Sequence, residues 1–194
     1  MKKFAVVLIF LTVLPSFAVF ANDASISMGL GMDFFNYQEV FLTTSAAFNI
    51  PAGRDMEVAI GAEFALWPNR DEITDAVEPS FFVPVNLGVQ FVFSKTNPNF
   101  LLGMGVSPVF IIFPAADAEA GEEPLRFYAG PYVKGGFRLQ IHEIMSWFLE
   151  VQQDLGIGKP NWVNTATRVI TGINFKILAN TDGKSTGGSK TVKK

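Results

Sequence analysis

Apolar and polar residues alternate with a period of two along most of this 194-residue chain, and no other feature limits its fold as strongly. In the segment 81–94, every odd position from Phe81 to Phe93 is apolar, whereas the even positions include Asn86 and Gln90. Successive side chains of a β-strand point to opposite faces of a sheet, so this spacing predicts a strand with one apolar face rather than a helix. Eight segments follow the pattern: 24–34, 41–50, 56–67, 81–94, 101–112, 126–139, 147–157 and 166–178.

The connections between these segments alternate between short and long. Short ones occur at 51–55, at 95–99 and around 141–143, whereas 68–80 and 114–124 are longer and acidic. Short turns at one end and long loops at the other are typical of outer-membrane barrels. We therefore predict an all-β fold, an eight-stranded antiparallel up-and-down transmembrane barrel.

The direction of the apolar face separates a membrane barrel from a soluble ligand-binding one, which would turn that face inward. Eight strands enclose an interior only just wide enough for side chains. The apolar face, mostly Leu, Ile, Val, Phe and Met, would overfill it. This face also contains no Asp, Glu, Lys or Arg, as expected where a lipid-facing Lys or Arg costs ~2–4 kcal/mol. The opposite face carries glycines that suit a crowded interior: Gly29, Gly31, Gly61, Gly88, Gly103, Gly105, Gly130, Gly136, Gly156 and Gly172.

Every charged residue of the eight segments is predicted to point into the barrel. An ion-selective pore is expected to show one dominant sign of charge, whereas equal numbers of acids and bases predict a paired, largely plugged lumen. The predicted lumen charge network consists of Asp33, Glu57, Glu63, Glu150 and Asp154 with Arg126, Lys134, Arg138, Arg168 and Lys176.

Two ion pairs of this network follow from the expected turns. A turn at 142–143 places Lys134 opposite Glu150, and a turn at Asn161 places Arg168 opposite Asp154. Three prolines lie within predicted strands, where each removes a hydrogen-bond donor of the ladder. We expect a bulge or a local break in pairing at each of them: Pro84, Pro108 and Pro131.

The first 21 residues have the form of a secretory signal peptide, with Lys2 and Lys3 before an apolar stretch at 4–14. An uncleaved membrane anchor is the alternative, but a bilayer-spanning helix needs ~20 apolar residues. Cleavage would leave 22–178 as the barrel and 179–194 as a flexible, basic periplasmic tail. The mature chain would carry 13 basic and 18 acidic residues. Export and this charge argue against a nucleic-acid partner.

With its signal peptide, its eight alternating strands and a last strand reading TRVITGINFKI, the chain resembles the small eight-stranded outer-membrane barrels of the OmpX, OmpA-transmembrane and OmpW groups. This resemblance implies a location in the outer membrane of a diderm bacterium, contact with outer-membrane lipid, and no cofactor. It also implies insertion by the barrel-assembly machinery, because Thr171, Ile173, Phe175 and Ile177 are similar to the terminal assembly signal of that class. The chain departs from the pattern by continuing beyond Ile177.

The predicted outer loops are acidic, and Arg70 and Lys159 are their only bases. Carboxylates could bind divalent cations or attract a basic extracellular partner, or they could serve solubility alone. The nine acids are Glu39, Asp71, Glu72, Asp75, Glu78, Asp117, Glu119, Glu122 and Glu123.

No catalytic constellation is evident, and the chain is predicted not to be an enzyme. His142 is the only histidine, which excludes a multi-histidine metal site. Glu57 and Glu63 are six residues apart on one strand, about 20 Å, too far to act together. Two function classes therefore remain. One is a non-enzymatic surface barrel with a plugged lumen and a structural or surface-interaction role. The other, which the OmpW likeness implies, is a narrow channel for small, even hydrophobic, molecules.

Overall fold

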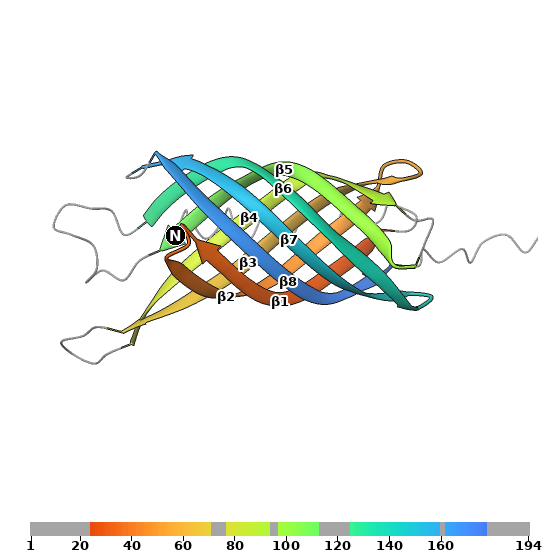
Figure 1. The fold of residues 1–194 in the computed structure, drawn as a ribbon, viewed down its shortest axis with the longest axis horizontal. Helices are drawn as coiled ribbons and strands as arrows, with labels where there is room; N and C mark the ends of the chain where they lie inside the picture. The colour runs from red at the N-terminus through yellow and green to blue at the C-terminus, as the bar shows by residue number, and fades with distance from the viewer. Residues whose placement is uncertain (1–23, 71–76, 94–96, 113–124, 160–161, 178–194) are drawn as a thin grey trace, which may run out of the picture.

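The computed structural model describes residues 24–70, 77–93, 97–112, 125–159 and 162–177. These residues form eight antiparallel strands, each paired with its neighbours in the chain, and the first strand pairs with the last to close a barrel (Figure 1). In chain order the strands are β1 (Ser25–Phe35), β2 (Glu39–Pro51), β3 (Met56–Arg70), β4 (Val77–Phe93), β5 (Asn99–Ile112), β6 (Leu125–His142), β7 (Met145–Gly158) and β8 (Val163–Lys176).

The predicted fold class is confirmed, and no strand end differs by more than four residues from its predicted position. Among the described residues, no helix has the length and apolar character needed to cross a membrane. The predicted signal peptide at 1–21 and the tail at 179–194 lie outside the described residues.

The connections define two ends of the barrel. The β1–β2, β3–β4, β5–β6 and β7–β8 connections lie at one end, hereafter the outer end. The other three connections lie at the inner end, where β1 starts and β8 finishes. The β1–β2 connection is a tight turn, since the Gln38 amide donates to the Phe35 carbonyl at 3.1 Å. At the inner end, the β6–β7 turn is formed by Glu143 and Ile144.

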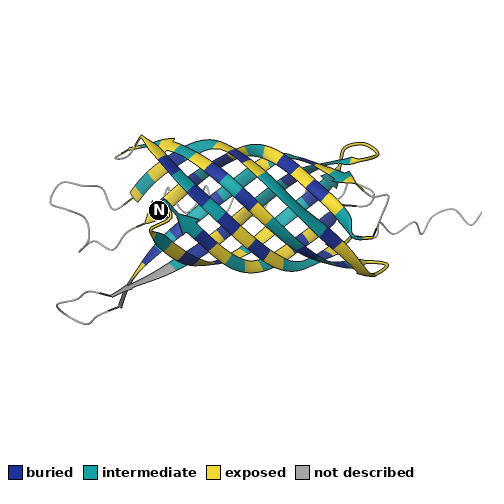
Figure 2. Cartoon of the chain, in the orientation of Figure 1, coloured by how far each residue is buried: buried dark blue, intermediate teal, exposed yellow. Residues whose placement is uncertain are grey.

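The two faces of the sheet are oriented as predicted. Buried and more exposed residues alternate along much of the sheet, most regularly in β1, β2, β5 and β8 (Figure 2). The outward positions carry large apolar side chains that are about half exposed, among them Met28, Leu30, Leu102, Met104, Val106 and Val133. Inward positions such as Asp33, Gln90 and Arg168 are fully buried. The outer wall is therefore an apolar surface without charge, as a barrel in lipid requires.

The interior departs from the prediction at the outer end, where its lining is apolar rather than polar. Phe41 and Phe82 point inward and are 0% and 1% exposed. Their ring centroids lie 5.5 Å apart, and Phe35 lies 5.5 Å from Phe82. We call this group the aromatic cap, and it consists of Phe35, Phe41, Ala65, Phe82, Val109, Ile111, Tyr128 and Ala166. The cap therefore forms a buried apolar cluster at the outer end of the lumen.

Each of the three strand prolines coincides with a local break in pairing. Near Pro84 the β3–β4 ladder has no paired residues between Ala62–Val85 and Ala65–Phe82. The β4–β5 ladder is interrupted where Val85 would meet Pro108, and the β6–β7 ladder at Gly130 and Pro131. Register is the same on both sides of each interruption, so the local-break alternative is confirmed at these prolines.

Adjacent glycines on β6 provide a matched test of interior packing. A Cβ atom on inward-facing Gly136 would overlap the Leu149 carbonyl oxygen and lie 2.9 Å from Glu150 Cγ. A Cβ on outward-facing Gly135 would meet nothing closer than the Leu101 carbonyl oxygen at 4.0 Å. We expect Gly136→Ala to lower the free energy of unfolding by about 1–3 kcal/mol through overpacking. Gly135→Ala should leave it unchanged or raise it by less than about 1 kcal/mol. Urea unfolding of refolded protein measures both, and equal effects would contradict the assigned faces.

Candidate functional site

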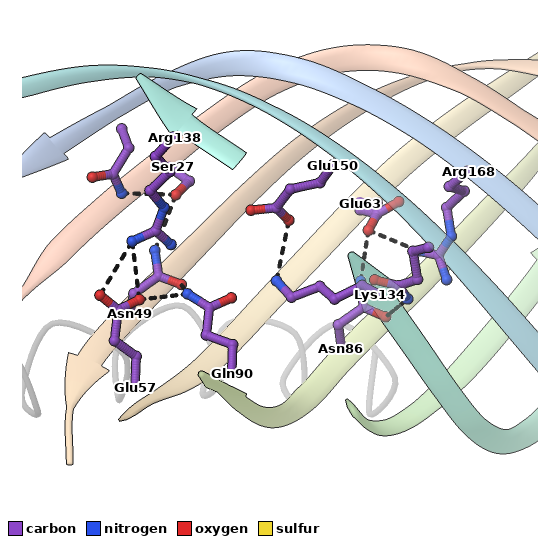
Figure 3. Close-up of polar contacts among 12 residues, drawn as sticks. Ser27, Asn49, Glu57, Glu63, Asn86, Gln90, Lys134, Arg138, Glu150 and Arg168 are labelled. Atoms are coloured by element: carbon purple, nitrogen blue, oxygen red, sulfur yellow. Dashed lines mark hydrogen bonds and ion pairs between the residues drawn. The ribbon is translucent and has the colours of Figure 1, made fainter. Parts of the chain in front are cut away.

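The interior below the aromatic cap holds three groups of ion pairs contributed by five of the eight strands, β1, β3, β6, β7 and β8. Their side chains are inward-facing members of the alternating pattern, so strand register alone brings them together. Figure 3 shows the groups in sequence: Arg138 with Glu57, then Lys134 with Glu150, then Arg168 with Glu63. The Arg168 group lies nearest the aromatic cap, because Asp33 and Phe35 are both inward positions close to the outer end of β1.

The Arg168 group joins four strands through one guanidinium. Arg168 is 0% exposed, and its Nη1 lies 2.7 Å from Glu63 Oε1 on β3. Its Nε lies 3.3 Å from Asp33 Oδ2 on β1 and donates to Asp154 Oδ2 on β7 at 3.1 Å. Arg168 Nη2 also pairs with Asp154. A planar guanidinium presents five donors on three nitrogens in a fixed fork, so it can contact several carboxylates in different directions more readily than an ammonium, which has three donors on one nitrogen.

Neutral amides extend the Arg168 group across the lumen. Asn86 of β4 donates to Glu63 Oε1 at 2.6 Å, and Gln152 of β7 donates to Asn86 at 3.1 Å and to Asp154 at 3.0 Å. These hydrogen bonds fix the positions of the two carboxylates. Asn86 and Gln152 were not among the predicted site residues. Both occupy inward positions of the alternating pattern, so the sequence could have indicated them.

The Arg138 group occupies the inner end. Arg138 Nη1 donates to both carboxylate oxygens of Glu57, at 3.1 and 3.0 Å. Gln90 donates to Glu57 and, at 3.3 Å, to Asn49. Ser27 of β1 accepts a hydrogen bond from Asn49 of β2 at 3.0 Å (Figure 3). It also accepts one from Asn174 of β8 at 2.9 Å. The group therefore ties together both sides of the seam where the barrel closes.

The charge balance of the interior differs from the predicted five acids and five bases. All five acids lie in the three groups, but only Lys134, Arg138 and Arg168 accompany them. Arg126 is half-buried near the outer end, where its positive charge attracts the Glu39 carboxylate. Lys176 is exposed at the inner end. The excess of acid is concentrated at Arg168, which faces three carboxylates.

The predicted contacts within the network form, but not from the predicted register. Lys134 lies opposite Gln152, not Glu150, and Arg168 lies opposite Gln152, not Asp154. The β6–β7 turn falls one residue later than expected, and a bulge lies between Gln140 and His142. Both pairs are diagonal neighbours about two residues apart in register, a separation that Lys and Arg side chains span.

A double-mutant cycle tests the Lys134–Glu150 pair, whose Nζ and Oε2 atoms lie 3.1 Å apart with little solvent exposure. Lys134→Glu should destabilise the barrel by placing like charges together, and adding Glu150→Lys should restore part of the loss. We expect a coupling energy of about 1–3 kcal/mol from urea unfolding of the four proteins. Additive effects would show that the two side chains do not interact.

Little empty space remains between these groups. A cavity of about 40 Å³ lies between the Lys134 and Arg168 groups, lined by Ser45, Asn86 and Tyr132 among others. A second cavity of about 10 Å³ is lined by Ser107, Asp154 and residues of the aromatic cap. Such volumes hold a few waters at most. A larger hollow of about 850 Å³ is bordered mostly by outward residues, such as Met28, Leu30 and Phe64, and also by the inward residues Ser45 and Glu63.

The acidic loops can be placed only in part. Glu39 begins β2 and Glu78 belongs to β4, both at the outer end. The remaining acids lie outside the described residues: Asp71, Glu72, Asp75, Asp117, Glu119, Glu122 and Glu123. Within the described ranges, no three His, Cys, Asp or Glu side chains are arranged to hold a metal ion.

Solved structures with the same fold come from bacterial surface barrels. Neisserial surface protein A superimposes with a TM-score of 0.61 at 8% identity, covering 79% of this chain and 96% of that one. Ail of Yersinia pestis gives 0.58 at 10% identity, covering 81% and 99%. The outer membrane protein OprG of Pseudomonas aeruginosa gives 0.55 at 13% identity, covering 82% and 97%. No protein-family model and no curated protein sequence matches the chain.

At these identities the likeness establishes the fold alone. The chain has the fold of the small eight-stranded outer-membrane barrels, as its sequence predicted. The predicted outer-membrane location agrees with these neighbours and with the apolar outer wall.

Proposed function

We propose that this protein is a non-enzymatic outer-membrane barrel whose lumen is closed and whose role is structural or surface-interacting. The observation that carries the proposal is the filling of the interior. Three groups of ion pairs and an aromatic cap lie one above another along the axis. The cavities between them, about 40 and 10 Å³, are too small for a continuous path of solvent.

Conductance in planar bilayers tests the closed lumen. Refolded residues 22–194 should give no discrete channel events. The double variant Lys134→Ala/Glu150→Ala removes only the middle ion pair beside the 40 Å³ cavity, so the Arg138 and Arg168 groups and the aromatic cap should keep it free of events under the same conditions. Reproducible channels from the unmodified protein would overturn the plug. They would favour the alternative, a narrow channel for small or hydrophobic molecules.

Membrane residence is tested separately. Fractionation of cells should place the mature chain with the outer membrane, and its migration on gels should change on heating, as expected when a barrel unfolds. Recovery of soluble chain without detergent would contradict a lipid-facing outer wall.

The proposed partners of the outer loops are divalent cations or basic molecules. The structure of Ail in complex with the heparin analogue sucrose octasulfate concerns a polyanion bound by that protein. The loops of this chain contain nine acids against two bases, so like charges would repel such a ligand. A charged ligand of these loops would therefore be cationic, opposite in sign to the ligand of that complex.

A further inference from the structure

A hydrogen-bonded patch of neutral polar residues interrupts the apolar outer wall at the outer end. Thr167 donates to Gln153 Oε1 at 2.5 Å, and Tyr37 of the β1–β2 turn lies 3.3 Å from Gln153 Oε1 and 3.2 Å from Thr167 Oγ1. Gln153 and Thr167 lie directly opposite each other on β7 and β8. Both point outward, because their neighbours Asp154 and Arg168 are buried in the lumen. We call these three residues the Tyr37 patch.

The turn holds the Tyr37 ring in place at a cost in backbone energy. Asn36 and Tyr37 have φ angles of 49° and 57°, as in a type I′ hairpin turn. The second of these positions strongly favours glycine, and a bulky side chain there is unusual. Asn36 fastens the turn to β8, since its amide donates to the Thr165 carbonyl at 2.7 Å and its Oδ1 accepts from the Thr165 amide at 2.9 Å. The ring is nevertheless 69% exposed, so interior packing does not account for it.

Hydrogen-bonding groups of the patch remain available to a ligand. The Gln153 side-chain amide has two N–H groups, and one of them donates to the Asp154 carbonyl at 3.3 Å. The second N–H has no described acceptor, and the hydroxyl oxygens of Tyr37 and Thr167 keep lone pairs. The patch thus combines an exposed ring face with a free donor and free acceptors, and none of its three side chains is charged.

We propose that the Tyr37 patch binds the neutral sugar headgroup of a glycolipid in the leaflet at the outer end. Aromatic rings at the ends of membrane barrels lie at headgroup level, so the patch meets headgroups rather than acyl chains. The hydroxyl groups of a sugar ring offer both donors and acceptors to Gln153, Thr167 and the Tyr37 hydroxyl. The apolar face of the same sugar ring can pack against the Tyr37 ring. The inference deepens the surface-interaction role proposed above and rests on it.

Native mass spectrometry of refolded residues 22–194 tests this assignment, with digalactosyl diacylglycerol as the probe. Phosphatidylcholine with the same acyl chains serves as the sugar-free comparison. The protein should retain the glycolipid in preference to phosphatidylcholine. Tyr37→Gly removes the ring while relieving the positive φ, so the turn should still form. Tyr37→Gly and Gln153→Leu should each reduce glycolipid retention about fivefold, as expected for the loss of a hydrogen bond or ring contact.

The matched control is Phe127→Leu, because Phe127 is an outward ring, 51% exposed, near the outer end of β6. This variant should retain glycolipid like the unmodified protein. Equal losses in Phe127→Leu and Tyr37→Gly, or undiminished retention in Tyr37→Gly, would overturn the assignment. Channel events from the unmodified protein would overturn the plug instead and leave the difference between these variants unchanged.

Discussion

Replacing Arg168 with methionine is expected to lower the free energy of unfolding by about 3–5 kcal/mol, the loss seen when one partner of a buried ionic group is removed. Arg168 is 0% exposed and is the cation paired with Asp33, Glu63 and Asp154. Without it, the three buried carboxylates would lie close together with no cation among them, so that like charges repel and each has lost solvation. Arg168→Lys should restore only part of the stability, since the ammonium has three donors on one nitrogen in place of the five donors of the guanidinium fork.

Urea unfolding of refolded protein in micelles measures this loss. The matched control is Arg54→Met, because Arg54 is an exposed arginine in the β2–β3 connection, and it should change the free energy of unfolding by less than about 0.5 kcal/mol. Neutralising the cluster in the Arg168→Met background should recover stability, using Asp33→Asn, Glu63→Gln and Asp154→Asn together. If Arg168→Met behaves like Arg54→Met, the carboxylates do not depend on the guanidinium for their burial.

The period-two pattern was sufficient to predict the fold, because in a closed barrel it determines which residues face lipid and which face the lumen. Once the apolar face of 81–94 is assigned to lipid, Asn86 and Gln90 must face inward, and the structure places both in lumen hydrogen bonds. The glycines at inward positions were predicted from the same alternation and from the crowding of the lumen. Tyr132 is 2% exposed because its ring lies against Gly105 of β5, where any Cβ would displace it.

Register and the aromatic cap could not be predicted in the same way. The turn of β6–β7 falls at Glu143–Ile144 rather than 142–143, and period-two patterns do not distinguish registers that differ by two residues. The long side chains of Lys134 and Arg168 nevertheless pair with Glu150 and Asp154, which lie two residues from the directly opposite position. The cap was missed because apolar residues on the inward parity, such as Phe82 beside Phe81, break the alternation. Such adjacent apolar pairs near a strand end are the signal that could have indicated an apolar mouth.

Phe82→Ala is expected to be the most destabilising change in the aromatic cap, by about 3–5 kcal/mol. Phe82 is 1% exposed and its ring contacts both Phe35 and Phe41, with centroids 5.5 Å away in each case. The adjacent Phe81 supplies the control. Its outward ring contacts Phe64 at a centroid distance of 5.4 Å, so Phe81→Ala should cost only about 1 kcal/mol beyond lost lipid contact.

The two phenylalanine variants also separate the roles of the cap and of the charged groups. Removing the Phe82 ring admits water to the outer mouth, but the Arg168, Lys134 and Arg138 groups still fill the lumen below it. Phe82→Ala should therefore unfold at lower urea than Phe81→Ala and yet remain without channel events in planar bilayers. Channel events from Phe82→Ala would show that the ring, rather than the ion pairs beneath it, closes the barrel. Equal urea midpoints for the two variants would contradict the inward position of Phe82. The combination of a large loss of stability and an unchanged closed state is specific to a lumen sealed by its buried charges.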